Sequence, residues 1–202
     1  VFSQLATAGE LPYGVGVALF NPGENRAQIL TRLDLATEAA RHFGGHRLQI
    51  RKPSASSSEG LGSLGWRQLI MDALISSRWV LYAQPVIRLH DRHIIHSEVV
   101  ARLAINSNEL VPAAQFLPMA ARHQLLPDVE RALLDLAIEA LAKRHAQVPL
   151  ALNITFDGLL FGPGALERLS EQIRSQAAKK ASLLSFEVSE FHFLSHLEQC
   201  GK

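Results

Sequence analysis

Hydrophobic positions between residues 13 and 51 follow the pattern of one helix between two strands. The apolar run at 13–20 and the alternating run at 46–51 predict the strands. From 27 to 43, apolar residues return every three or four positions, as on one face of a helix, and Gly44-Gly45 ends it. A unit of this size buries too little apolar surface to be stable alone. The pattern therefore indicates the C-terminal part of a larger domain.

Residues 53–65 break this periodicity. Ser, Gly and Pro dominate the segment, so it lacks the apolar side chains that a packed element needs. We therefore expect a flexible linker that divides the chain into 1–52 and 66–202.

Strands and helices alternate after the linker. The apolar pattern predicts strands at 79–89, 94–103, 149–156 and 183–188, and helices at 66–77, 112–123, 127–145, 165–178 and 191–199. The first two strands are close enough to form a hairpin. The alternation predicts an α/β fold with a largely parallel sheet, open or closed into a barrel. A closed eight-stranded barrel needs ~200–250 residues, so we expect only the first part of one.

Composition narrows the function classes. The chain is 48% hydrophobic and 19% charged, as in ordinary globular proteins. Its net charge of +1 argues against binding to a nucleic-acid polymer, which needs a basic field. Its one cysteine, Cys200, cannot form an internal disulfide, which favours a reducing compartment.

Three polar residues stand where a strand is expected to carry apolar ones: Glu98, Asn153 and Glu187. A buried unpaired carboxylate is costly, and the carboxyl ends of strands form the functional face of α/β sheets and barrels. Two carboxylates and an amide converging there would form an all-oxygen site suited to Mg²⁺, Mn²⁺ or Ca²⁺. The alternative is that these residues cap strand ends or pair with arginines.

Five segments carry a family resemblance, in family order. They are QPV at 84–86, EVVARL at 98–103, FLPMAA at 116–121, LNIT at 152–155 and FEVSE at 186–190. They resemble the motifs Q-P-I, E-A-L-x-R-W, F-I-P-x-A-E, V-N-x-S and L-E-I-T-E of the EAL domain of bacterial cyclic-di-GMP signalling. The resemblance implies the first part of an EAL-type TIM-like barrel.

The first segment resembles the end of a GGDEF domain. GVGVA at 14–18, LDLA at 33–36 and GHR at 45–47 are similar to its late motifs. The whole chain thus resembles a tandem GGDEF–EAL protein, from late in one α/β domain to the middle of the next.

The resemblance implies roles for five residues. Glu98, Asn153 and Glu187 match the metal ligands of active EAL phosphodiesterases, while Gln84 and Arg102, together with Glu98, match positions at the dinucleotide. A guanidinium suits phosphate because it is a planar, two-pronged donor. For Arg102 a salt bridge to a strand-end carboxylate is the alternative, and for Gln84 a structural hydrogen bond.

The residues that depart from the family motifs indicate a loss of catalytic activity. E-A-L has become Glu98-Val99-Val100, Ala121 replaces a Glu and Leu103 a Trp. The family's D-D-F-G motif and Lys, which complete the metal site, would lie beyond the last residue. We therefore expect no catalytic residues and no hydrolysis by this polypeptide. Such decay resembles the LapD-like receptors, inner-membrane proteins that bind cyclic-di-GMP in the cytoplasm.

The function expected from the resemblance is a catalytically inactive cyclic-di-GMP receptor in a cytoplasmic module of an inner-membrane protein. A phosphodiesterase using Mg²⁺ or Mn²⁺ in an intact parent is one alternative, and a protein-interaction remnant without ligand is another. Besides cyclic-di-GMP, the expected partner is the GGDEF domain of the same protein, with a homodimer left open. His90, His93 and His96 are interpreted as solvated residues at a hairpin turn.

Overall fold

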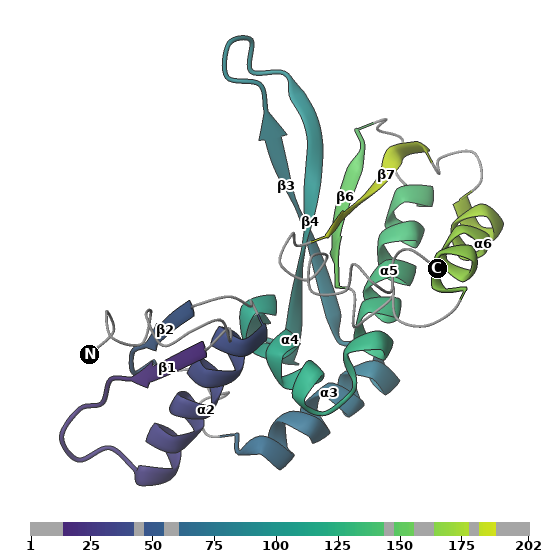
Figure 1. Ribbon diagram of the computed structural model, residues 1–202. Coiled ribbons are helices and arrows are strands. Elements are labelled where there is room, and N and C mark those ends of the chain that lie inside the picture. Colours follow the sequence, from purple (N-terminus) through teal and green to yellow (C-terminus); the bar gives the residue numbers. More distant parts are fainter. Residues whose placement is uncertain are drawn as a thin grey trace, which may run out of the picture.

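The chain folds into two sheets with helices packed beside them (Figure 1). The computed structural model describes residues 14–42, 47–54, 61–143, 148–155, 164–177 and 182–188. The helix expected at 191–199 lies outside these residues. Among the described helices, none combines the length and the apolar character that a membrane crossing requires.

The first unit is the strand–helix–strand arrangement that the hydrophobic pattern predicts. Strands β1 (Gly14–Ala18) and β2 (Arg47–Arg51) pair in parallel, and α2 (Arg26–His42) connects them. The glycines of β1 allow α2 to approach closely, because a Cβ at Gly16 would lie 2.4 Å from the backbone nitrogen of Thr37.

A long hairpin dominates the second sheet and projects from the body of the molecule (Figure 1). Strands β3 (Trp79–Ile87) and β4 (Ile94–Asn106) are antiparallel, which confirms the predicted hairpin. Strand β5 (Glu109–Pro112) pairs with the end of β4 and is not among the predicted strands. It is four residues long, too short to produce a periodic signal, and it follows a turn in which the Asn108 amide donates to Asn106 Oδ1 at 2.9 Å.

Two further strands extend this sheet in parallel with β4. Strand β6 (Leu150–Ile154) lies beside β4, and β7 (Leu184–Val188) lies beside β6. The sheet is therefore antiparallel at the β3 side and parallel at the β7 side. It stays open, as expected for the first part of a barrel.

In the described part of the chain, four helices accompany this sheet: α3 (Ser63–Ser76), α4 (Ala113–Arg122), α5 (Leu126–Lys143) and α6 (Ala165–Ala177). Helix α3 begins at Ser63, within the segment 53–65 and three residues before the start of the helix expected at 66–77. The physical reason is tertiary, since Leu61 packs against the hydrophobic core and Gly62, in extended conformation, caps the helix just after it.

The core lies between the helices and one face of the sheet, here called the helix-covered face. Along β4, Val99 packs with residues of α5 and α6, whereas Leu103 packs with residues of α3 and α4. Trp66 and Phe116 are fully buried in the second of these clusters.

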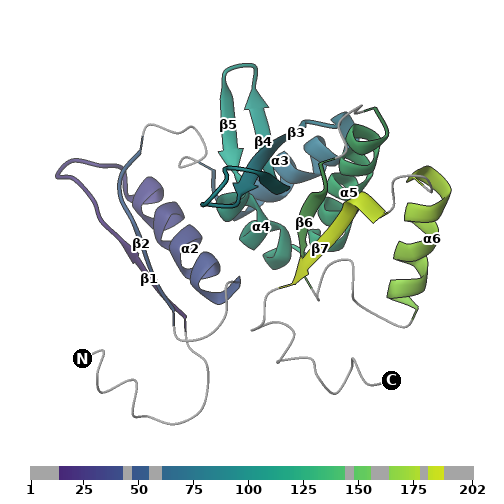
Figure 2. The same ribbon diagram turned by 90° about the horizontal axis from the view of Figure 1, so that it is seen from above.

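Helix α2 joins the two units by lying against α4 (Figure 2). The Arg122 guanidinium lies 3.5 Å from Glu38 Oε1 and 3.8 Å from Asp34 Oδ2. Arg51 also donates to the carbonyl oxygen of Ala114 at 3.2 Å. The first unit is therefore attached to the second through polar contacts around α4 and through Leu35 of α2, which is buried in the same hydrophobic cluster as residues of α3 and α4.

Candidate functional site

The polar side chains of the sheet gather on the face opposite the core, here called the open face. Successive strand residues point to opposite sides of a sheet. In β4, burial alternates accordingly, with residues 97, 99, 101 and 103 buried and their neighbours partly exposed. The open face therefore carries His96, Glu98 and Arg102 from one strand.

The strand register brings the predicted ligand-binding residues onto this face. Gln84 of β3 is the direct partner of Glu98 in β4, and it is exposed. Directly opposed antiparallel residues have Cβ atoms about 4.5–5.5 Å apart. The two side chains can therefore contact one molecule together.

Arg102 lies four residues beyond Glu98 on the same face. Its Nη1 donates to the carbonyl oxygen of Ala101 at 3.0 Å, and its guanidinium lies 6.0 Å from the ring centroid of Tyr82. Within the described ranges Arg102 forms no ion pair. This argues against the alternative that Arg102 serves as a salt-bridge partner of a strand-end carboxylate. Tyr82 is 51% exposed, so a cation and an aromatic ring are both accessible here.

Three metal-binding side chains converge farther along the open face. The ligand atoms of His96, Glu98 and Glu187 all lie within 4.8 Å of one another. Between strands β4 and β7, His96 Nε2 lies 3.8 Å from Glu187 Oε1. The structure thus brings together two of the three predicted oxygen ligands, although Glu98 lies near the start of β4 rather than at its carboxyl end.

Asn153, the third predicted oxygen ligand, is the register partner of Glu187 in the parallel β6–β7 pair. It is exposed while the rest of β6 is buried, so it also lies on the open face. Neighbouring strands are about 4.8 Å apart. The amide therefore stands beside the carboxylate cluster.

The donor set fits a divalent cation. Carboxylate and imidazole ligands bind such ions at about 2.0–2.2 Å, which places ligand atoms roughly 3–4 Å from each other around the ion. The present spacing of the three groups, within 4.8 Å, is close to that range. The set also includes the imidazole nitrogen of His96, which is not part of the all-oxygen set expected from the sequence.

Two residues of this face are not predicted by the sequence. The interpretation of His96 as a solvated turn residue is wrong, because it lies within β4 with 27% of its side chain exposed. Tyr82 is not singled out by any motif. His96 stands two residues before Glu98, and Tyr82 stands two residues before Gln84. Because residues two apart in a strand lie on the same face, this spacing is the signal that could have identified both.

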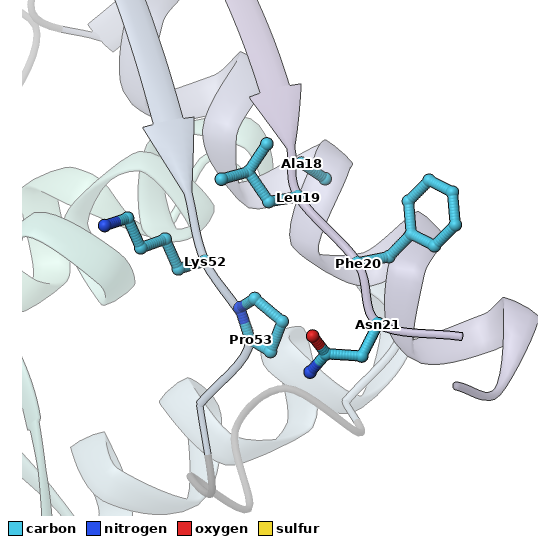
Figure 3. A pocket seen from close by; sticks show the side chains of 6 residues that line it. All are labelled: Ala18, Leu19, Phe20, Asn21, Lys52 and Pro53. Carbon is cyan, nitrogen blue, oxygen red and sulfur yellow. The ribbon is translucent and has the colours of Figure 1, made fainter. Parts of the chain in front are cut away.

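A hollow outside the larger sheet has fewer polar groups that could bind a ligand. It lies where the chain leaves β1 and β2, and its lining is Ala18, Leu19, Phe20, Asn21, Lys52 and Pro53 (Figure 3). Figure 3 shows Lys52 and Phe20 pointing to opposite sides rather than toward a common ligand. The nearby Arg32 is already engaged, since its Nη1 donates to Leu19 O at 2.6 Å and to Glu24 Oε2 at 2.9 Å.

Comparison with known proteins identifies the fold. The family model of the EAL domain matches residues 67–201. An uncharacterized 76.5 kDa protein of Thiocystis violacea is 28% identical over 72% of this chain and 21% of its own length. The signaling protein YkoW of Bacillus subtilis is 21% identical over 93% of this chain and 24% of its own. The chain thus spans about a quarter or less of these relatives.

Solved structures agree. The S helix–GGDEF–EAL structure of Vibrio cholerae LapD, bound to c-di-GMP, has a TM-score of 0.72 at 20% identity, over 91% of this chain and 44% of that one. The FimX EAL domain of Pseudomonas aeruginosa, bound to c-di-GMP, has a TM-score of 0.55 at 29% identity, over 66% of this chain and 54% of that one. The interpretation of the five resembling segments is therefore confirmed, and the chain belongs to the EAL domain family.

Proposed function

We propose that this chain is part of a receptor that binds cyclic-di-GMP without hydrolysing it. The observation that carries the proposal is the arrangement on the open face, where Gln84 opposes Glu98 and Arg102 stands over the exposed ring of Tyr82. The proposal is supported by the c-di-GMP complexes formed by the similar LapD and FimX proteins.

The chemistry of a cyclic dinucleotide matches this face. Its phosphates are anionic, and a guanidinium offers them two parallel donors. Its bases have flat faces that stack on aromatic rings such as Tyr82. The Gln84 amide and the Glu98 carboxylate supply a donor and acceptors for the polar edges of a guanine.

The absence of turnover is inferred from the residues around this arrangement. Val100, also on the open face between Glu98 and Arg102, stands where the family has the leucine of E-A-L. Ala121 and Leu103 replace a family Glu and Trp. The first change removes a leucine from the open face beside Glu98, whereas Leu103 and Ala121 belong to the core on the helix-covered face. Gln84 and Arg102 remain in place.

The test is calorimetric titration of cyclic-di-GMP into the full chain, with and without Mg²⁺, followed by chromatography of the nucleotide. We expect binding in both conditions and recovery of the intact dinucleotide. Arg102→Ala should weaken binding about 10- to 100-fold, the loss of a hydrogen bond to a charged group. Arg67→Ala, which removes an exposed arginine on α3, is the matched control and should bind like the wild type.

Two other outcomes identify the alternatives. Metal-dependent conversion to the linear dinucleotide would establish a phosphodiesterase, the function that the His96, Glu98 and Glu187 cluster favours. An absence of heat with a folded chain would leave a protein-interaction remnant. Equal binding by the wild type and Arg102→Ala would place the dinucleotide elsewhere.

We further infer that the β1–α2–β2 unit is the end of a GGDEF domain, and that the EAL domain follows the segment around 53–65. The polar contacts between α2 and α4 support an intramolecular partnership of the two domains. On this proposal the chain belongs to a cytoplasmic module of an inner-membrane protein.

A further inference from the structure

His96 presents an unused nitrogen to two carboxylates. Its Nε2 is shielded from solvent, and among the described residues no hydrogen-bond partner reaches it. Its nearest charged neighbour, Glu187 Oε1, lies at 3.8 Å, beyond hydrogen-bonding distance. Buried polar atoms are nearly always paired, so an unpaired one needs an explanation.

A metal ion provides that explanation. Neutral imidazole is a common metal ligand, and its lone pair binds the ion through Nε2 or Nδ1. An ion placed among His96, Glu98 and Glu187 would satisfy this nitrogen and would also neutralise the repulsion between the two carboxylates. Since the carboxylates come from β4 and β7, the ion would also connect strands that are not neighbours.

We propose that His96 completes a metal site with Glu98 and Glu187, two of the metal ligands that the family resemblance implies, and that this imidazole gives the site a preference for a first-row transition-metal ion of the Zn²⁺ or Co²⁺ type over Mg²⁺. Mg²⁺ selects oxygen ligands in an octahedral arrangement, whereas imidazole nitrogen favours Zn²⁺ and its neighbours in the series. Three protein ligands leave a fourth position for water or for the adjacent Asn153 amide, as in zinc sites that keep an exchangeable ligand.

This site shares Glu98 with the proposed dinucleotide site but needs no dinucleotide. Metal binding is therefore measured without nucleotide, and the two proposals fail separately. A chain that binds Zn²⁺ but not cyclic-di-GMP would refute only the proposed function. A chain that binds cyclic-di-GMP and shows no preference for Zn²⁺ would refute only the metal site.

The experiment uses the full chain, stripped with a chelator and then titrated with Zn²⁺ against a chromogenic competitor, and separately with Mg²⁺. We expect Zn²⁺ to bind at least about 100-fold more tightly than Mg²⁺. His96→Ala should weaken Zn²⁺ binding at least about tenfold and leave Mg²⁺ binding within about threefold. His93→Ala, in the exposed part of the hairpin, is the matched control and should bind Zn²⁺ like the wild type.

A second variant distinguishes the loss of a metal ligand from the loss of folding. His96→Gln keeps a polar side chain and replaces nitrogen with an amide oxygen donor, so the Zn²⁺ preference should fall while the circular dichroism spectrum stays unchanged. The visible absorption of bound Co²⁺ should also differ between the wild type and His96→Gln, because one ligand changes from nitrogen to oxygen. Wild-type Zn²⁺ affinity in both folded His96 variants, or equal affinity of the wild type for Mg²⁺ and Zn²⁺, would overturn the proposal.

Discussion

Replacing Gly16 with alanine should destabilise the β1–α2–β2 unit, because the new methyl group would meet the backbone of α2. The added Cβ would lie 2.4 Å from Thr37 N and Thr37 Oγ1, and 2.7 Å from Thr37 Cα. Favourable contacts between heavy atoms lie near 3.5–4.0 Å. Rotation of the Thr37 side chain relieves only one of these clashes, so the helix itself must move by roughly 1 Å.

The expected cost follows from this displacement. Overpacking of a closely packed site costs about 1–3 kcal/mol, and the upper part of that range, about 2–3 kcal/mol, applies at Gly16 because the clash is with helix backbone. Alanine also restricts the unfolded chain, which offsets about 0.4–1 kcal/mol. The net loss is therefore about 1–2.5 kcal/mol in the free energy of opening this unit. A two-stranded sheet is marginally stable by itself, so we expect α2 to open before the larger sheet does.

Hydrogen exchange of the α2 amides measures this opening directly. They should exchange about 5- to 70-fold faster in Gly16→Ala than in the wild type, while the amides of α5 change little. Gly62→Ala is the matched control, because nothing lies within 4 Å of its added Cβ. Exchange of α2 at the wild-type rate in Gly16→Ala would refute the reasoning, since it would mean that the helix accommodates the methyl group without loss.

Three further substitutions test contacts on the helix-covered side of the sheet and between α4 and α2. Glu130→Ala removes the buried acceptor of the Thr155 amide, at 2.9 Å, and should lower the free energy of unfolding by about 1.5–3 kcal/mol in urea titrations; wild-type stability would contradict this. Phe116→Ala empties a fully buried position beside Trp79, whose ring centroid is 5.4 Å away, and should cost about 3–5 kcal/mol in the same assay, so a loss below about 1 kcal/mol would mean that the site collapses. Arg122→Ala breaks the pairs with the two α2 carboxylates and should cost only about 0.2–1 kcal/mol, an effect that high salt removes; a larger, salt-independent loss would show another role.

Helices and strands with a sustained period are predictable from local sequence. The helix expected at 127–145 is α5 at Leu126–Lys143, and the strand expected at 183–188 is β7 at Leu184–Val188. In both cases the apolar stripe packs against the core, so the local pattern and the tertiary packing agree. Strand β5 and the start of α3 escape prediction, because four residues carry no period and because Leu61 is ordered by a core that other elements supply.

The residues of the candidate site also differ in whether the sequence alone predicts them. Glu98, Asn153 and Glu187 are recognisable from the sequence alone as polar residues inside apolar strands, since such positions are costly without a purpose. His96 carries no such mark. It stands two residues before Glu98, close to a turn, where a solvated histidine is ordinary.

By itself, the sequence determined most of the strands, β5 excepted, and, through the alternation of side chains, which of their residues share a face. It also determined the family, through short motifs in a specific order. Apart from the β3–β4 hairpin, only the tertiary structure decided which strands lie side by side. The order β4–β6–β7 brings Glu187 to His96 from a distant part of the chain, because the helices bury the opposite face of these strands and thereby set their register.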